Sequence, residues 1–321
     1  MFMPWLRWVT ELLAAKAICL FATLGARHGV LLDTPGSTRL TSRRAWWVRP
    51  LWQEKFEMYL PIEPQPTNVK AWLAAATAVE NLGGEANNVV IDIADPLLED
   101  ETDAQIIRVV DSFLRTHHCN ALNGVANTIF PQSLFDQHGP DQFYRAYHDR
   151  VFPRMKTITR DWGRYFERLT SWKKLVNNKV EVINPLDDLV TFMRGQISSD
   201  KKTYRNAYEM TVYDPGRDAG KGSNRQCLSF LSFKLTNDNR LLLTVMYRNH
   251  AYIARGLGNF IGLGRLQAFV AGQAGAQMGS LTCISTHAMI DHGKSSKGDQ
   301  GQGWSRAEAI ALLEECRSLM G

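Results

Sequence analysis

One cysteine, Cys227, stands where an extended strand is expected to begin, at the start of the alternating apolar run CLSFLSFKL. A loop containing Gly220, Gly222 and Ser223 precedes it, so the sulfur can face a cavity. Arg225 lies two residues earlier, and residues i and i+2 of an extended chain share a face. A guanidinium there lowers the pKa of the thiol and favours the nucleophilic thiolate. A strand cysteine is also commonly a small buried hydrophobe, so both interpretations stay open.

The strand that begins at Cys227 belongs to a predicted hairpin, because two apolar runs flank the turn composition TNDN within residues 227–249. Further strands are expected over 87–95, 206–215 and 279–291. Helical spacing, capping residues and glycine stops predict helices over 68–84, 100–118, 141–155, 184–199, 259–275 and 305–320. The pattern indicates an α+β fold with a mostly antiparallel sheet.

Composition places the chain among ordinary globular proteins, with 45% hydrophobic and 21% charged residues in 321. No CxxC pair or metal-like Cys/His spacing is present, and the number of cysteines is odd. The cysteines are Cys19, Cys119, Cys227, Cys283 and Cys316. Scattered cysteines of this kind predict reduced thiols and a cytoplasmic location, and argue against a disulfide scaffold.

Charge is concentrated at the start of the chain. Residues 1–56 carry eight Lys and Arg against three Asp and Glu, which is the whole net charge of +5. The remainder is neutral, so a basic groove for nucleic acid is not expected. Residues 12–26 are apolar but contain Lys16 and are too short for a membrane span. We interpret 1–60 as a basic extension, disordered or a leader, with a proline-rich linker at 60–67.

Three further segments carry a resemblance to a known family. RQCLSFLSFKL, MYRNHAYIARGLGNF and STHAMI, in this order, resemble the catalytic half of thymidylate synthases and the related pyrimidine hydroxymethylases. In that family a cysteine opens a strand and an arginine closes the next. An asparagine or aspartate then heads a helix, and a histidine lies in a later strand. The matching residues are Cys227, Arg248, Asn259 and His287. The resemblance implies one twisted, mostly antiparallel sheet flanked by helices over 61–321.

The resemblance also implies a chemistry. The thiolate of Cys227 would add to C6 of a dUMP-like pyrimidine nucleotide, so that C5 can attack a one-carbon electrophile. Arg248 would hold the 5′-phosphate with help from Arg225, because a planar guanidinium suits phosphate. The carboxamide of Asn259 would recognise the base edge, and His287 would lie near the sugar or its phosphate.

Two more residues and two partners follow from the same comparison. Asn249 joins the substrate-binding set beside Arg248. Arg205, in KTYRNAY, is the nearest candidate for an arginine that a partner subunit supplies, so a homodimer is expected. The family's one-carbon donor, 5,10-methylenetetrahydrofolate, is the implied cofactor, and no metal or membrane is expected.

Three positions depart from the family pattern: Ala251 replaces an aspartate that binds the folate pterin, Leu228 replaces a histidine, and Met289 replaces a tyrosine. The residues that the family uses as nucleophile and to bind the nucleotide thus match this sequence better than those that it uses to bind folate. A catalytically altered nucleotide-binding protein is therefore the alternative to a C5 methyl- or hydroxymethyltransferase.

A cysteine hydrolase that pairs Cys227 with His250 or His287 is a third possibility, although no oxyanion-hole signature accompanies it. The transferase hypothesis makes a geometric prediction that can be examined directly. Cys227, Arg248, Asn259 and His287 should all line one cavity.

Overall fold

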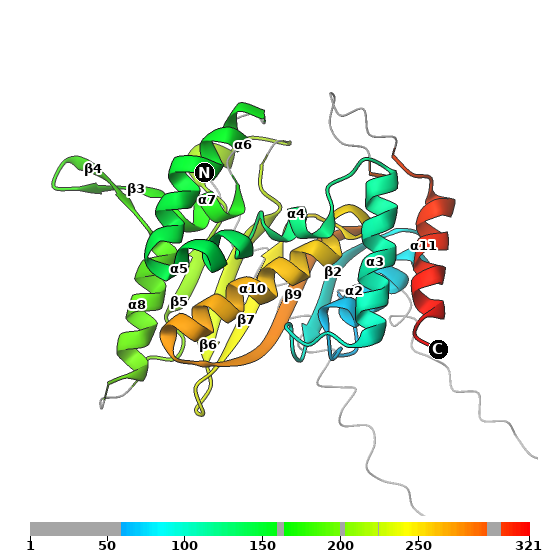
Figure 1. The fold of residues 1–321 in the computed structure, drawn as a ribbon, viewed down its shortest axis with the longest axis horizontal. Helices are drawn as coiled ribbons and strands as arrows, with labels where there is room; N and C mark the ends of the chain where they lie inside the picture. Colours follow the sequence, from blue (N-terminus) through cyan, green and yellow to red (C-terminus); the bar gives the residue numbers. More distant parts are fainter. Residues whose placement is uncertain (1–58, 159–163, 200–202, 224, 294–302) are drawn as a thin grey trace, which may run out of the picture. The chain divides into compact units, whose positions relative to one another are not determined.

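A mixed sheet of seven strands forms the centre of the computed structural model, which describes residues 59–158, 164–199, 203–223, 225–293 and 303–321. The strand order is β1-β2-β9-β7-β6-β5, and β8 pairs with β9 (Figure 1). The strands are β1 (Leu60–Pro61), β2 (Glu85–Ile93), β5 (Tyr208–Thr211), β6 (Leu228–Leu235), β7 (Arg240–Tyr247), β8 (His250–Ala251) and β9 (Gln277–Met289).

Antiparallel pairing joins β2 to β9, β6 to β7 and β5 to β6, whereas β7 and β9 run parallel. The β6–β7 hairpin has the predicted position, with Asn239 at positive φ (60°) in its turn. The α+β class predicted from the sequence is confirmed. The long parallel pair makes the sheet mixed, because helix α10 (Leu257–Ala274) crosses over between β7 and β9.

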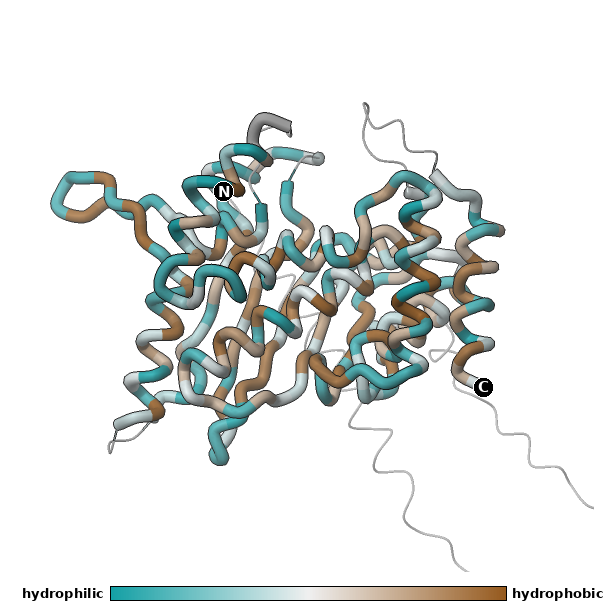
Figure 2. Tube along the Cα trace, in the orientation of Figure 1, coloured by the Kyte–Doolittle hydropathy of each residue, from teal (hydrophilic) through white to brown (hydrophobic). Residues whose placement is uncertain are grey.

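One face of the sheet is buried and the other is partly exposed. Along β6, Leu231 and Phe233 are buried while Phe230 and Ser232 are half-buried, and β7 and β9 show the same alternation. Helix α10 packs on the buried face, where Gln267 donates from Nε2 to the carbonyl oxygens of Leu241 (2.8 Å) and two residues of β9. Figure 2 shows hydrophobic residues recurring along these central strands.

Helices flank the sheet at both ends. Around β2 lie α2 (Asn68–Asn81), α3 (Glu101–Thr116) and α11 (Arg306–Ser318), and around β5 lies α8 (Pro185–Ile197) (Figure 1). The other helices and turns are α4 (Leu122–Ala126), α5 (Gln132–Ala146), η2 (Tyr147–Val151), α6 (Phe152–Ile158), α7 (Tyr165–Thr170), α9 (Pro215–Asp218) and η3 (Tyr252–Gly256). The predicted capping box of α11 is present, since Ser305 and Glu308 bond reciprocally.

The predicted end of one helix and the predicted linker were wrong. The helix expected over 141–155 is part of a longer run, α5–η2–α6, with a kink at Gly139 (φ 68°). Pro153 does not end it, because a proline in the first turn of α6 costs no hydrogen bond within that helix. The linker expected at 60–67 instead contributes the edge strand β1, where Pro61 suits an edge position.

The sequence interpretation also missed several elements. Helices α4 and α7 are short, and a separate hairpin of β3 (Trp172–Val176) and β4 (Lys179–Ile183) turns at Asn177 and Asn178, both at positive φ. The interpretation of residues 1–58 lies outside the described residues. Within the part of the chain that the structure describes, no helix is long and apolar enough to cross a membrane.

Candidate active site

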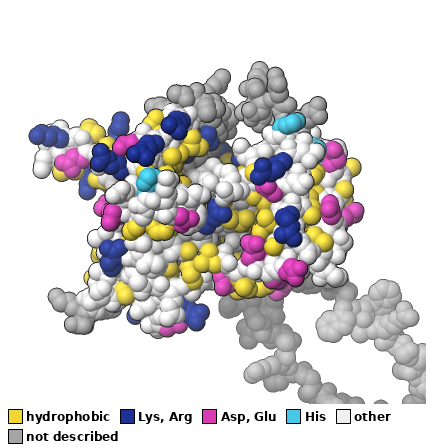
Figure 3. Space-filling model, in the orientation of Figure 1, with side chains coloured by type: hydrophobic (Ala, Val, Ile, Leu, Met, Phe, Trp, Pro, Cys, Tyr) yellow, Lys and Arg dark blue, Asp and Glu magenta, His cyan; other side chains and the backbone are white. Residues whose placement is uncertain are grey.

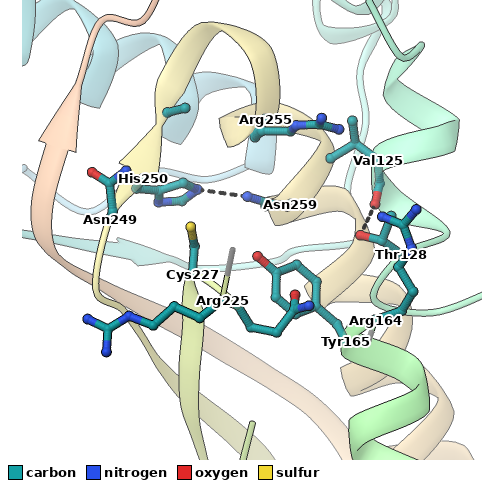
Figure 4. Close-up of a pocket in the computed structure, with 12 residues that line it drawn as sticks. Val125, Thr128, Arg164, Tyr165, Arg225, Cys227, Asn249, His250, Arg255 and Asn259 are labelled. Atoms are coloured by element: carbon teal, nitrogen blue, oxygen red, sulfur yellow. Dashed lines mark hydrogen bonds between the residues drawn. The ribbon is translucent and has the colours of Figure 1, made fainter. Parts of the chain in front are cut away.

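A pocket of about 170 Å³ opens around Cys227, at the beginning of β6, where α4, α7, β8, η3 and α10 meet (Figure 4). The lining residues are Val125, Thr128, Arg164, Tyr165, Arg225, Gln226, Cys227, Asn249, His250, Ala251, Arg255 and Asn259. Three of these carry a guanidinium, and none of these described residues is an aspartate or glutamate. The pocket therefore combines one thiol with a locally cationic wall.

Cys227 is half-buried at the entrance to β6, and its carbonyl oxygen accepts a hydrogen bond from the backbone N–H of Arg248 (2.9 Å). Burial raises the pKa of the thiol above its ordinary value, while the charges of Arg248, Arg255 and Arg225 act in the opposite direction. The sequence predicted the direction of the Arg225 effect, but desolvation is the larger cause. The thiol is thus protonated at neutral pH until another group or a ligand assists its deprotonation.

Tyr165 begins helix α7 and directs its hydroxyl towards Cys227 (Figure 4). Its Oη accepts a long hydrogen bond from the backbone N–H of Leu228 (3.4 Å). Burial raises the pKa of the phenol, with a smaller contribution from Cys227, so the hydroxyl is neutral and can donate. This residue was missed from the sequence, since the helix that carries it was not predicted.

A buried ion pair holds α7 in place. The guanidinium of Arg168 bonds both carboxylate oxygens of Asp218 and the carbonyl oxygen of Val212, and both charged side chains are almost fully buried. Removing one partner of such a pair leaves an uncompensated buried charge, which costs about 3–5 kcal/mol. The pair fixes Tyr165 and Arg164 relative to the loop that leads to Cys227.

Asn259, in the first turn of α10, is oriented by a buried histidine. Its amide nitrogen donates to Nε2 of His250 (3.1 Å), and Nδ1 of His250 lies 2.9 Å from the hydroxyl of Ser285. The imidazole stacks between Tyr247 and Tyr252, with ring centroids at 4.1 and 5.0 Å. Burial lowers the pKa of His250 to about 3, so the ring is neutral. The second N–H and the oxygen of the Asn259 amide are left for a ligand.

Four of the predicted site residues line the pocket: Cys227, Arg225, Asn249 and Asn259. The prediction that Arg248 and His287 line it too was wrong. Arg248 donates from Nε to the carbonyl oxygen of Gln226 (2.9 Å) and from Nη2 to that of Arg225 (3.1 Å). It therefore shapes the loop before the nucleophile.

His287 and Arg205 also lie outside the pocket lining. Nδ1 of His287 lies 2.6 Å from Oδ1 of Asn249, so this histidine contacts a lining residue without lining the pocket itself. Arg205 bonds the carbonyl oxygen of Thr236 in the β6–β7 turn, at the opposite end of β6 from Cys227. Its predicted role in a partner's site stays a prediction.

The structure adds Arg164 and Arg255 to the set. Arg255 lies on η3, four residues before Asn259, and this spacing on a helix places two side chains on one face. That spacing was visible in IARGLGN and could have identified the residue. For Arg164 the sequence held no comparable signal, because α7 contacts the pocket only through the tertiary fold.

The arrangement does not support a cysteine–histidine hydrolase. Nε2 and Nδ1 of His250 are both engaged, by Asn259 and Ser285, and a ring with a pKa of about 3 does not form an ion pair with a thiolate at neutral pH. His287 bonds Asn249 and lies outside the pocket lining. Of the two histidines considered for Cys227, His250 thus lines the pocket with both ring nitrogens engaged, and His287 does not line it.

Comparison with known proteins gives a curated relative and a set of solved structures. No family model matches the chain. A stretch of 129 residues, 40% of the chain, is 29% identical to a protein of Methanosarcina acetivorans named putative thymidylate synthase. The chain is thymidylate synthase-like. The match spans 52% of that relative, so this thymidylate synthase-like chain covers about half of its length.

One of the solved structures is the thermostable thymidylate synthase A of Bacillus subtilis, at 11% identity and a TM-score of 0.44. The superposition covers 77% of this chain and 84% of the other.

Proposed function

We propose that this thymidylate synthase-like chain transfers a one-carbon group to C5 of a pyrimidine nucleotide resembling dUMP. One observation carries the proposal: Cys227 and Asn259 face one pocket whose described lining contains three arginines and no carboxylate. A nucleophile, a base-recognising amide and a surplus of positive charge are what a covalent reaction on a nucleotide monophosphate requires.

In the proposed reaction the thiolate of Cys227 adds to C6, and the C5–C6 double bond becomes an enolate with nucleophilic C5. C5 then forms a bond to the electrophilic carbon of the donor, while the C=O or C=N π bond of that carbon breaks and its heteroatom takes the electron pair. Loss of the C5 proton and expulsion of the thiolate restore the double bond and the free enzyme. A hydroxymethyl product needs a donor at the oxidation level of formaldehyde, and a methyl product needs a hydride as well.

The surrounding residues have roles that follow from their positions. Arg225 and Asn249 lie on one side of Cys227, where they would bind the 5′-phosphate, and Arg248 holds the backbone of that side. Asn259, oriented by His250, would bind the base edge. The hydroxyl of Tyr165 is directed towards Cys227, so in the proposed complex it would lie near C5 and could pass a proton to solvent.

The described lining offers no carboxylate to the N–H and amino groups of a pterin, and Ala251 stands where the resemblance implies an aspartate. The proposed steps therefore do not depend on a folate.

Solvent deuterium exchange at C5 of dUMP tests the proposal without a donor. Reversible addition of Cys227 to C6 makes C5 exchangeable, so incubation in D2O should deuterate C5, as read by NMR. Exchange should stop in Cys227→Ser, which should still bind dUMP by calorimetry. Intact mass spectrometry after 5-fluoro-dUMP, with and without methylenetetrahydrofolate, should show an adduct on the wild type only.

Binding of dUMP without exchange would instead establish the alternative, a nucleotide-binding protein that has lost the chemistry. Absence of binding, exchange and adduct would contradict both functions.

A homodimer is proposed as well, formed through the partly exposed face of the sheet. Phe230, Leu242, Met246 and Ile284 all point to this face, and none of them is fully buried in the single chain. Stacking of two such faces buries apolar side chains that are partly exposed to solvent in the single chain. A partner would also bring the proposed phosphate arginine, Arg205.

A further inference from the structure

The arginines of the pocket lie on two sides of Cys227. Figure 4 shows the guanidinium of Arg225 directed to one side, with Asn249, and those of Arg164 and Arg255 on the other, with Val125 and Thr128. A nucleotide monophosphate carries one phosphate, which the first side accounts for. Arg164 and Arg255 add to the positive charge of the pocket, but the function proposed above assigns no ligand group to them.

Arg255 is held there by a rigid element. Asp291 accepts hydrogen bonds from the backbone N–H groups of Ile253 (2.9 Å) and Ala254 (3.1 Å), and Trp72 donates from Nε1 to the carbonyl oxygen of Tyr252 (2.7 Å). These hydrogen bonds pair the backbone groups of the turn immediately before Arg255. The backbone from which the arginine side chain projects is therefore fixed.

Space around the next residue is equally restricted. A Cβ at Gly256 would lie 2.9 Å from Tyr252 and 3.0 Å from Trp72. The side chain of Arg255 therefore projects from an anchored turn, and among the described residues it makes no ion pair.

Placing two guanidinium groups together has an electrostatic cost. Burial is the main cause that lowers the pKa of Arg164, and the positive charge of Arg255 lowers it further. Like charges confined in one partly buried pocket repel, and an anion between them relieves the repulsion. Arg255, which makes no ion pair among the described residues, is thus placed next to Arg164 where it can bind an anionic group.

The position of the pair relative to the base identifies which molecule supplies that anion. With C6 at Cys227 and the base edge at Asn259, Arg255 lies one turn of helix from the base-recognising amide, on the side away from Arg225. The donor must approach C5 from this side. The inference rests on the proposed function for this orientation of the base.

We propose that Arg164 and Arg255 form a second anion subsite, which binds a carboxylate or phosphate group of the one-carbon donor next to C5. The donor class is therefore an electrophilic one-carbon compound with a negative group close to the transferred carbon.

Two isosteric nucleotides test this subsite directly. 5-Carboxymethyl-dUMP places a carboxylate next to C5, and 5-carbamoylmethyl-dUMP places a neutral amide of the same size there. By calorimetry the wild type should bind the carboxylate about tenfold or more tightly than the amide, the effect of one charge-assisted hydrogen bond. In Arg255→Gln this ratio should approach one, while the affinity for dUMP stays within about twofold of the wild type.

Arg225→Gln is the matched control, since it removes a guanidinium from the other side. It should weaken all three nucleotides and keep the ratio between carboxylate and amide. Arg255→Lys keeps the charge and should retain part of the preference, and thermal melting of each variant checks that it is folded.

The outcomes separate the two proposals. Equal affinity of the wild type for carboxylate and amide, with dUMP bound, would overturn the second subsite alone. Loss of dUMP affinity in Arg255→Gln would assign Arg255 to the nucleotide phosphate, and this result would also overturn the second subsite. Failure of all three nucleotides to bind the wild type would overturn the proposed function and the subsite together.

Discussion

At the scale of residues, the state of Cys227 is decided by two opposing effects. Half-burial removes water from the thiolate and raises the pKa, and three nearby arginines lower it. Desolvation is the larger effect, so the free protein keeps a protonated thiol. A nucleotide phosphate would neutralise part of the arginine charge. Stabilisation of the thiolate would then depend on a hydrogen bond from the neighbouring Tyr165 and on solvent.

Alkylation kinetics should follow this balance. With iodoacetamide, the rate at Cys227 should keep rising with pH beyond pH 9, because the thiolate is the nucleophile and its pKa is raised. In Arg225→Gln the pKa rises further, because one of the charges that lower it is removed, so the rate at pH 8 should fall.

Peptide mass spectrometry would distinguish Cys227 from the fully buried Cys283, whose pKa burial raises to about 12. Arg240→Gln, at the exposed far end of β7, is the control and should leave the rate unchanged. A rate that levels off below pH 8 would contradict the assigned pKa direction.

At the scale of elements, close packing of α10 on α4 forms one wall of the pocket. A Cβ at Gly258 would lie 2.6 Å from the Cβ of Val125 and 3.1 Å from the carbonyl oxygen of Leu122. Gly262 is equally close to the backbone of Ala126. These glycines let the helices approach, and the approach brings Val125 opposite Asn259.

Gly258→Ala should therefore destabilise the fold and widen the pocket. Overpacking at a fixed helix contact costs about 1–3 kcal/mol in the free energy of unfolding, measured by urea titration. Nucleotide affinity should fall with it, because Val125 and Asn259 move apart.

Gly272→Ala, in the same helix with nothing within 4 Å of its Cβ, is the control. It should be neutral or stabilise by about 0.5–1 kcal/mol, because alanine loses less conformational entropy than glycine in a helix. Equal stability of the two variants would show that the α10–α4 contact is not tight.

At the scale of the whole molecule, the two faces of the sheet differ in a way that predicts assembly. Helix α10 covers one face, and on the other face Met246 is 37% exposed. Basic side chains gather over the region of β3–β4 and α5–α7 on the side of the molecule seen in Figure 3. On the partly exposed face of the strands the charged side chains are those of Lys234, Arg240, Asp92 and Glu209.

Sedimentation velocity should show a dimer at micromolar concentration, and Met246→Lys should convert it to a monomer. An unpaired lysine buried between two sheets costs several kcal/mol, so the dissociation constant should rise about a hundredfold or more. Met320→Lys, exposed in the last turn of the chain, is the control and should leave the dimer intact. A monomeric wild type would contradict the proposed interface.

Local signals in the sequence were sufficient for much of the fold. Capping residues located α8 and α11, the TNDN turn located the β6–β7 hairpin, and alternating apolar residues located the sheet face. They failed for α7, which is six residues long and is held by Arg168 and Asp218, fifty positions apart. Such an element has no periodicity of its own to detect.

The sequence by itself determined the nucleophile candidate, Cys227, and its order relative to Asn259, because both lie at the ends of strongly patterned elements. Only the tertiary structure decided which arginines accompany them. Arg248 was expected to line the pocket, but it donates to backbone carbonyl oxygens instead. Arg164 and Arg255 line the pocket. A long flexible side chain can point many ways from one backbone position, so its direction depends on contacts from distant segments.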